Sequence, residues 1–190
     1  MSAIILLGAD RPFGAELATR LAHEGELATE LPPTGPIEAL VINVPVVREG
    51  TRFGEITDAQ LEEALEAMVF DVVAAVQQAL PRLAPGARIV AVAARGHLGA
   101  WGGAHLMAAN AALAGFIRSI ALELGERGIR ANLLAPDFAG ERWDTPKTRA
   151  EVAEAAAFLA APGMALMNGQ TLLLDGMRSM RLTESRRPQG

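Results

Sequence analysis

Short apolar runs that alternate with helical segments constrain the fold of this chain more than any other feature. Five runs have the length of buried strands: 3–8, 38–44, 87–94, 129–134 and 170–174. Most of the segments between them show the three- and four-residue apolar spacing of helices. Strands that alternate with helices form parallel sheets with right-handed crossovers. The sequence therefore predicts an α/β fold with a doubly wound parallel sheet.

Four helices are predicted, at residues 13–23, 57–83, 101–126 and 150–160. The second begins with the spacing of a capping box, Thr57 followed by Gln60. The helices over 57–83 and 101–126 are apolar around most of their circumference, although a helix that covers one sheet face needs only one apolar stripe. Small residues between Ala108 and Gly115 would also let another helix approach closely. We expect these two helices to form an oligomer interface.

Composition excludes several classes of function. The chain has 190 residues, of which 51% are apolar, so it is long enough for one domain and too apolar for disorder. It has no cysteine and only three histidines, so no metal site is expected. Its net charge of −5 argues against nucleic-acid binding. Because no leader-like segment or apolar run of 18 residues occurs, we expect a cytoplasmic protein.

Several short motifs follow one another in a characteristic order. GADRPFG spans residues 8–14 after the first strand, and LVINVP spans 40–45. RAN at 130–132 and APD at 135–137 accompany the fourth strand, and GQTLLLDG at 169–176 contains the last. In order and spacing, these segments resemble the short-chain dehydrogenase/reductase family over nearly the whole chain. The resemblance implies a Rossmann-like fold and an NAD(P)-dependent oxidoreductase.

The positions that carry the family's chemistry have lost their reactive side chains. The family uses a serine, a tyrosine and a lysine, with an asparagine on the first long helix. The resemblance places Ala94, Leu106, Asn110 and Met68, respectively, at these four positions. Leucine has no proton to transfer, and a neutral amide cannot lower the pKa of a neighbouring acid as an ammonium group does. The chain contains no tyrosine, and its only lysine is Lys147, so a shifted alignment cannot restore the triad.

The glycine-rich turn that would hold the cofactor is also altered. Its remnant consists of Gly8, Asp10, Arg11, Pro12 and Gly14. Pro12 replaces the glycine that lets the backbone approach the pyrophosphate, and proline has no N–H to donate. We expect Asp10 to be the N-cap of the helix, where its carboxylate would repel phosphate and Arg11 would partly offset it. The prediction is that no cofactor binds, with weak residual NAD(P) binding as the alternative.

The adenosine-binding part is predicted to be short. Only 25 residues separate Gly14 from Leu40, whereas one strand–helix–strand unit needs about 30. One short strand at 27–31 fits, so we expect a Rossmann-like sheet that lacks most of its second and third strand–helix units. Glu30 is a candidate for the acid that binds the ribose. Residues 1–45 would then be a reduced nucleotide-binding part, 46–177 a remnant of the catalytic half, and 178–190 a basic tail.

Three functions are compatible with these features. The first is a catalytically inactive subunit that assembles with an active family member through helices 57–83 and 101–126 and the C-terminal tail, or with itself. The second is a sensing module that binds a small molecule or nucleotide. The third is an oxidoreductase with different chemistry, in which His97 or His105 acts with Asn110.

Overall fold

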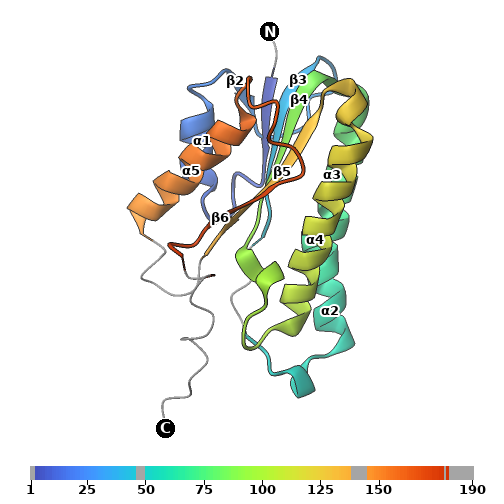
Figure 1. Cartoon of the computed structure of the whole chain (residues 1–190), viewed down its shortest axis with the longest axis vertical. Helices are drawn as coiled ribbons and strands as arrows, with labels where there is room; N and C mark the ends of the chain where they lie inside the picture. The colour runs from blue at the N-terminus through green and yellow to red at the C-terminus, as the bar shows by residue number, and fades with distance from the viewer. Residues whose placement is uncertain (1–2, 46–49, 138–144, 178, 180–190) are drawn as a thin grey trace.

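The fold is one six-stranded parallel sheet between two layers of helices (Figure 1). The computed structural model describes residues 3–45, 50–137, 145–177 and 179. The strands are β1 (Ala3–Leu7), β2 (Glu26–Ala28), β3 (Ile37–Asn43), β4 (Leu83–Val92), β5 (Arg130–Pro136) and β6 (Thr171–Leu174). Their order in the sheet is β2-β1-β3-β4-β5-β6, and every neighbouring pair is parallel. The predicted α/β class is confirmed.

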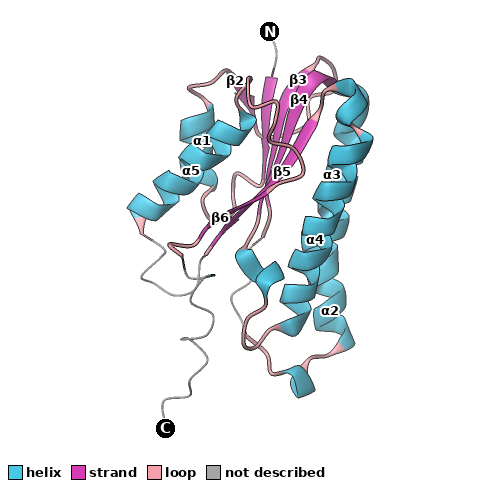
Figure 2. Cartoon of the chain, viewed as in Figure 1, coloured by secondary structure: helices cyan, strands magenta, loops and turns pink. Residues whose placement is uncertain are grey.

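The helices divide between the two faces of the sheet (Figure 2). One face carries α1 (Gly14–Leu21) and α5 (Pro146–Ala160), and the other carries α2 (Asp58–Leu65), α3 (Asp71–Ala79) and α4 (Ala104–Glu123). Alternate residues of β1 enter different cores, because side chains of a strand point to opposite faces. Ile5 packs under α2–α4, whereas Ile4 and Leu6 pack under α1 and α5.

The predicted helix over 57–83 is present and begins at its predicted cap. The Thr57 hydroxyl accepts from the backbone N–H of Gln60 at 3.3 Å, and the Gln60 side chain accepts from the Thr57 N–H at 3.0 Å. One π-helical turn, Glu66–Phe70, separates α2 from α3 and contains Met68. Such wide turns occur frequently at functional sites, and Met68 stands here where the family has its asparagine.

The region between β1 and β3 is short. β2 has three residues, and residues 29–36 connect it to β3 without a helix. Strand order 3-2-1-4-5-6 is usual in doubly wound sheets, so this sheet has one strand beyond β1 where that order has two. Leu31, in this connection, packs against the core on the α2–α4 side. Its side chain thereby shields part of the surface that a crossover helix would otherwise shield.

One predicted helix cap and one predicted helix start are wrong. Asp10 does not cap α1: the N-cap is Phe13, at φ 70°, and no side chain caps this helix among the described residues. Pro12 lies before the helix rather than in its first turn. The last helix begins at Pro146, because Thr145 and Thr148 form a capping box upstream of the expected start at Ala150. Lys147 therefore lies in a helix and not in a loop.

Candidate functional site

The glycine-rich turn after β1 is held by its own side chains. The Asn43 amide donates to the carbonyl oxygens of Gly8, at 3.0 Å, and Pro12, at 2.8 Å. Arg11 reaches across the turn and donates through Nη1 to the Asn43 carbonyl at 2.9 Å. These bonds join the carboxyl ends of β1 and β3, which is where open α/β sheets bind their ligands.

Glycine is required at both ends of this turn. Gly8 has φ +78°, and a Cβ there would lie 2.5 Å from the Asn43 carbonyl oxygen. A Cβ on Gly14 would lie 2.0 Å from the carbonyl oxygen of Ala9. The predicted turn residues Gly8 and Gly14 therefore fix the shape of this turn.

Part of the turn's backbone donor capacity is used within the turn or is missing. In dinucleotide-binding folds the pyrophosphate is held by backbone N–H groups where the helix begins. Here the Arg11 N–H donates to the Gly8 carbonyl at 3.1 Å, and the Gly14 N–H donates to the Arg11 carbonyl at 2.9 Å. Pro12 has no N–H, and Glu16 adds a negative charge in the first turn of α1. These residues do not fit a bound dinucleotide.

Two of the degenerate catalytic positions lie in the apolar core between the sheet and α2–α4. Met68 is 2% exposed and Leu106 is 6% exposed, and both belong to this hydrophobic cluster. Asn110 is 3% exposed beside them, and its amide donates to the Leu106 carbonyl at 2.9 Å. Its Oδ1 finds no hydrogen-bond partner within the described part of the chain. Ala94, at the serine position, is half-buried after β4.

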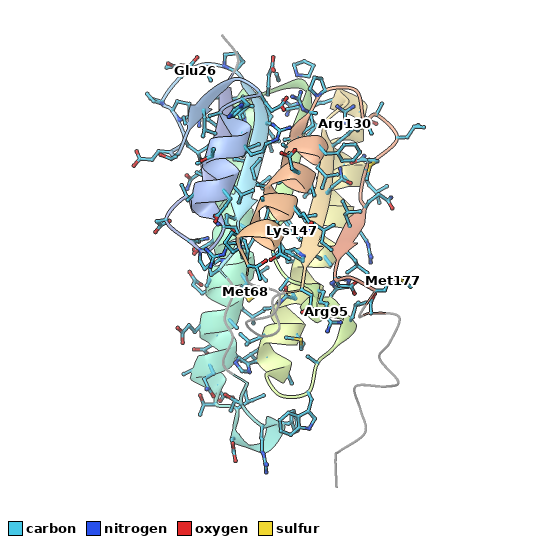
Figure 3. The ribbon with its side chains drawn as sticks, turned by 90° about the vertical axis from the view of Figure 1, so that its left-hand side faces the viewer. Glu26, Met68, Arg95, Arg130, Lys147 and Met177 are labelled. Carbon is cyan, nitrogen blue, oxygen red and sulfur yellow. The ribbon has the colours of Figure 1, made fainter. Side chains whose placement is uncertain are left out.

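A buried ion pair lies where β4 and β5 end, and sequence reasoning missed it. Arg95 Nε lies 3.0 Å from Asp137 Oδ2, with side chains 17% and 3% exposed. Lys147, labelled in Figure 3, lies on α5, on the face of the sheet opposite α2–α4. Arg95 directly follows Ala94, and Asp137 ends the APD segment at 135–137. Nothing in the local sequence around either residue indicates that the two side chains pair.

Asp175 extends this charged group to the end of β6. Burial would raise the pKa of its carboxyl, but hydrogen bonds from Ser179 and Met177 and the nearby charge of Arg95 lower that pKa below its usual value. The Met177 N–H donates to Oδ1 at 3.0 Å, and the Ser179 N–H donates to Oδ2 at 2.6 Å. Asp175 therefore braces the turn that follows β6.

The two candidate histidines lie near the degenerate positions. His97 is half-buried and His105 is 7% exposed. Burial lowers the pKa of His97, the charge of Arg118 lowers it further, and a hydrogen bond with the Ala94 backbone raises it in part. Neither Nδ1 atom has a hydrogen-bond partner among the described residues. Within the described part of the chain, neither histidine forms an ion pair or a hydrogen bond with a carboxylate that would orient it as a base.

Protonation of His97 is expected to destabilise the fold. Because its folded-state pKa lies below the ordinary value of about 6.5, the unfolded chain binds more protons as the pH falls through this value. The free energy of unfolding should therefore decrease between pH 7 and pH 5, and a His97→Gln variant should show a shallower decrease. Urea denaturation at several pH values measures this, with exposed His23→Gln as the control. Equal slopes for His97→Gln and the unaltered chain would contradict the prediction.

Two cavities open near the carboxyl ends of the strands. One of about 430 Å³ lies between the turn and α3, where Gly8, Arg11, Glu30, Asp71 and Gln78 contribute to its lining. Another of about 390 Å³ lies between β6 and α5. Glu30, the predicted ribose-binding acid, thus lies beside the remnant turn. Over the described residues, no group of three or more His, Asp or Glu side chains could hold a metal ion.

Comparison with known proteins identifies relatives over most of the chain. The family described as enoyl-(acyl carrier protein) reductase matches residues 26–146. The chain is 31% identical to the 3-oxoacyl-(acyl-carrier-protein) reductase FabG of Escherichia coli over 163 residues, an alignment that covers 75% of this chain and 66% of the reductase. It is 28% identical to the corresponding reductase of Vibrio cholerae over 166 residues, with the same coverage. The alignments thus span just under two thirds of the length of these relatives.

Solved structures have the same fold. A short-chain dehydrogenase/reductase from Serratia marcescens superposes with a TM-score of 0.80 at 23% identity, covering 94% of this chain and 97% of that one. A dehydrogenase/reductase from Sinorhizobium meliloti superposes with a TM-score of 0.79 at 21% identity, covering 92% and 94%. Together with the sheet order and the glycine-rich turn, the sequence matches show that the chain belongs to the short-chain dehydrogenase/reductase family.

Proposed function

We propose that this chain is a catalytically inactive member of its family and serves as a subunit that assembles with an active short-chain dehydrogenase/reductase in the cytoplasm. The observation that carries the proposal is the replacement of the reaction centre by apolar core. Leu106 and Asn110 stand at the positions of the proton donor and of the ammonium group that lowers its pKa. Leu106 is 6% exposed and belongs to the same apolar core as Met68.

The charged side chains nearby do not replace the missing acid. Arg95 is paired with Asp137 at 3.0 Å, so the positive charge at the end of β4 is balanced by the negative charge at the end of β5. A guanidinium group stays protonated at neutral pH and cannot act as a general acid. Reduction of a carbonyl group requires a positioned proton donor, and no tyrosine exists in the chain to supply one.

Loss of cofactor binding is the second part of the proposal. The turn uses its Arg11 and Gly14 N–H groups internally, and Arg11 spans the crevice to Asn43. Between β2 and β3, residues 29–36 leave no room for the further strand and helices of a complete adenosine-binding half. We therefore expect no stoichiometric NAD(P) site in this subunit.

Assembly is supported by what the chain retains. The α2–α3 and α4 helices are intact, and their outward faces carry alanines and exposed Phe70 and Leu122. The basic C-terminal tail, with Arg178, Arg181, Arg186 and Arg187, lies outside the described residues. The stoichiometry of dinucleotide per subunit in a co-purified complex tests the proposal, because an inactive subunit adds mass without adding cofactor sites.

A sensing module is the second candidate, and the cavity beside Glu30 favours it. This cavity of about 430 Å³ combines polar groups with the apolar side chains of Leu7, Leu31 and Ile42. Small-molecule sites have such mixed linings. A bound ligand would raise the melting temperature of the isolated chain, and no shift with nucleosides, nucleotides or amines would count against this function.

A further inference from the structure

One asparagine of this chain precedes a glycine, the pair in which attack by the backbone on an asparagine side chain is least hindered. Asn168 is followed by Gly169. The other three asparagines precede valine, alanine and leucine: Asn43, Asn110 and Asn132. Glycine has no side chain to shield its own backbone nitrogen, and it adopts the widest range of backbone angles. The sequence around Asn168 therefore favours loss of its side-chain amide.

The side chain of Asn168 joins three parts of the fold. Its Oδ1 accepts from the backbone N–H of Ala131 at 3.0 Å, and its Nδ2 donates to the carbonyl oxygen of Ala121 at 2.9 Å. Ala121 lies in the last turn of α4, where backbone carbonyls lack helical partners, and Ala131 is the second residue of β5. The Asn168 side chain thus ties the end of α4 and the start of β5 to the segment that leads into β6.

The backbone on both sides of this bridging side chain is held as well. The Gly169 N–H donates to the Ala131 carbonyl at 2.8 Å. Asn132 donates through Nδ2 to the Met167 carbonyl at 2.8 Å and accepts at Oδ1 from the Gln170 N–H at 3.0 Å. In the folded chain, the nitrogen that would attack and the amide that would be attacked are therefore both engaged in hydrogen bonds.

These bonds can break together when the edge of the sheet opens. β6 is the edge strand beside β5, and its four residues are all half-buried (Figure 1). Segments with few buried contacts open locally at a lower free energy than the core does. The rate at which Asn168 loses its amide should therefore depend on this local opening.

We propose that Asn168 is a deamidation site that the folded β5–β6 edge protects, so that the reaction marks chains in which this edge has opened. In the open chain, the Gly169 nitrogen loses its proton and bonds to Cγ of Asn168. The bond from Cγ to the amide nitrogen breaks, and ammonia leaves. Water then opens the resulting five-membered imide and yields aspartate or isoaspartate. The inference goes beyond the proposed function and does not depend on it.

The product cannot rebuild the bridge. A carboxylate at position 168 accepts hydrogen bonds and donates none, so the Ala121 carbonyl would lose its donor and face a negative oxygen instead. Isoaspartate would also lengthen the backbone and displace the Gly169 N–H from the Ala131 carbonyl. A buried acceptor without a partner destabilises the fold, so the edge should stay loosened after the reaction.

The first test incubates the full chain at mildly alkaline pH, folded in buffer and unfolded in urea. The tryptic peptide 150–178 contains Asn168 as its only asparagine, and mass spectrometry with fragmentation assigns the change to this residue rather than to Gln170. We expect deamidation to be at least about tenfold slower in the folded chain. Asn132→Ala removes both bonds that hold the neighbouring backbone, so it should speed the reaction in buffer and leave the rate in urea unchanged.

A variant that mimics the product tests the effect on the edge. Asn168→Asp should raise the hydrogen-exchange rate of the Gly169 amide at least about tenfold. Gln170→Glu makes the same change of charge on a neighbouring exposed residue and should leave that rate unchanged. The inference is overturned if folded and unfolded chains deamidate at equal rates, if position 168 keeps its amide even in urea, or if the two variants exchange the Gly169 amide at the same rate.

Discussion

Replacing Arg95 with methionine is expected to lower the free energy of unfolding by about 3–5 kcal/mol. Asp137 is 3% exposed and lies 3.0 Å from Arg95, so the variant would leave its carboxylate in the interior without this cation. Removing one member of a buried ion pair is far more costly than replacing both members by apolar groups. Urea denaturation of the isolated chain, followed by circular dichroism, measures the change.

Two further variants make this result interpretable. Arg95→Met/Asp137→Leu removes both charges and should recover most of the lost stability. Arg20→Met removes a surface arginine that pairs with Glu24 at 2.6 Å and Glu154 at 2.7 Å, and should cost at most about 1 kcal/mol because exposed pairs contribute little. If Arg95→Met destabilised no more than Arg20→Met, the ion pair would not organise the ends of β4 and β5 as described.

Gly14→Ala is expected to cost about 3 kcal/mol or more. The new Cβ would lie 2.0 Å from the Ala9 carbonyl oxygen, and the obstacle is backbone, which cannot rotate away as a side chain can. The turn would have to open, which would disturb the bonds from Asn43 to Gly8 and Pro12. Overpacking of this kind typically costs 1–3 kcal/mol or more.

Gly115→Ala is the matched control for this change. It lies within α4, and a Cβ there would have no neighbour within 4 Å. Alanine is the better helix former by about 1 kcal/mol, so the isolated chain should become slightly more stable. Equal melting temperatures for the Gly14→Ala variant and the unaltered chain would show that the turn does not need glycine.

The sequence predicts the fold well because its main signals are local. Apolar runs ended by proline or glycine placed the five long strands of the sheet, and Thr57 and Gln60 placed the start of α2. The predicted starts of helices were less accurate where more than one residue could serve as the N-cap. Aspartate is a common N-cap residue, so Asp10 was a reasonable prediction. However, the turn between Gly8 and Gly14 continues past Asp10, so the helix begins later and its N-cap is Phe13, at positive φ.

The candidate site was predicted only in part, because its character depends on contacts between distant segments. The motif order assigned Leu106, Asn110 and Met68 to the site, and the structure adds that all three are buried. The Arg95–Asp137 pair joins residues 42 positions apart and has no local signature. The bonds from Asn43 and Arg11 across the turn likewise depend on β1 and β3 being neighbours in the sheet.

We propose that this subunit contributes structure to a complex and no cofactor site. The deciding experiment is to co-express the chain with the short-chain dehydrogenase/reductase encoded nearest to it, measure the mass of the purified complex by light scattering, and titrate NAD(H) and NADP(H) into the complex and into each component. We predict a mixed oligomer whose bound dinucleotide equals the number of partner subunits alone, with none bound by the isolated chain. Saturable binding of about one dinucleotide per subunit by the isolated chain would contradict the account.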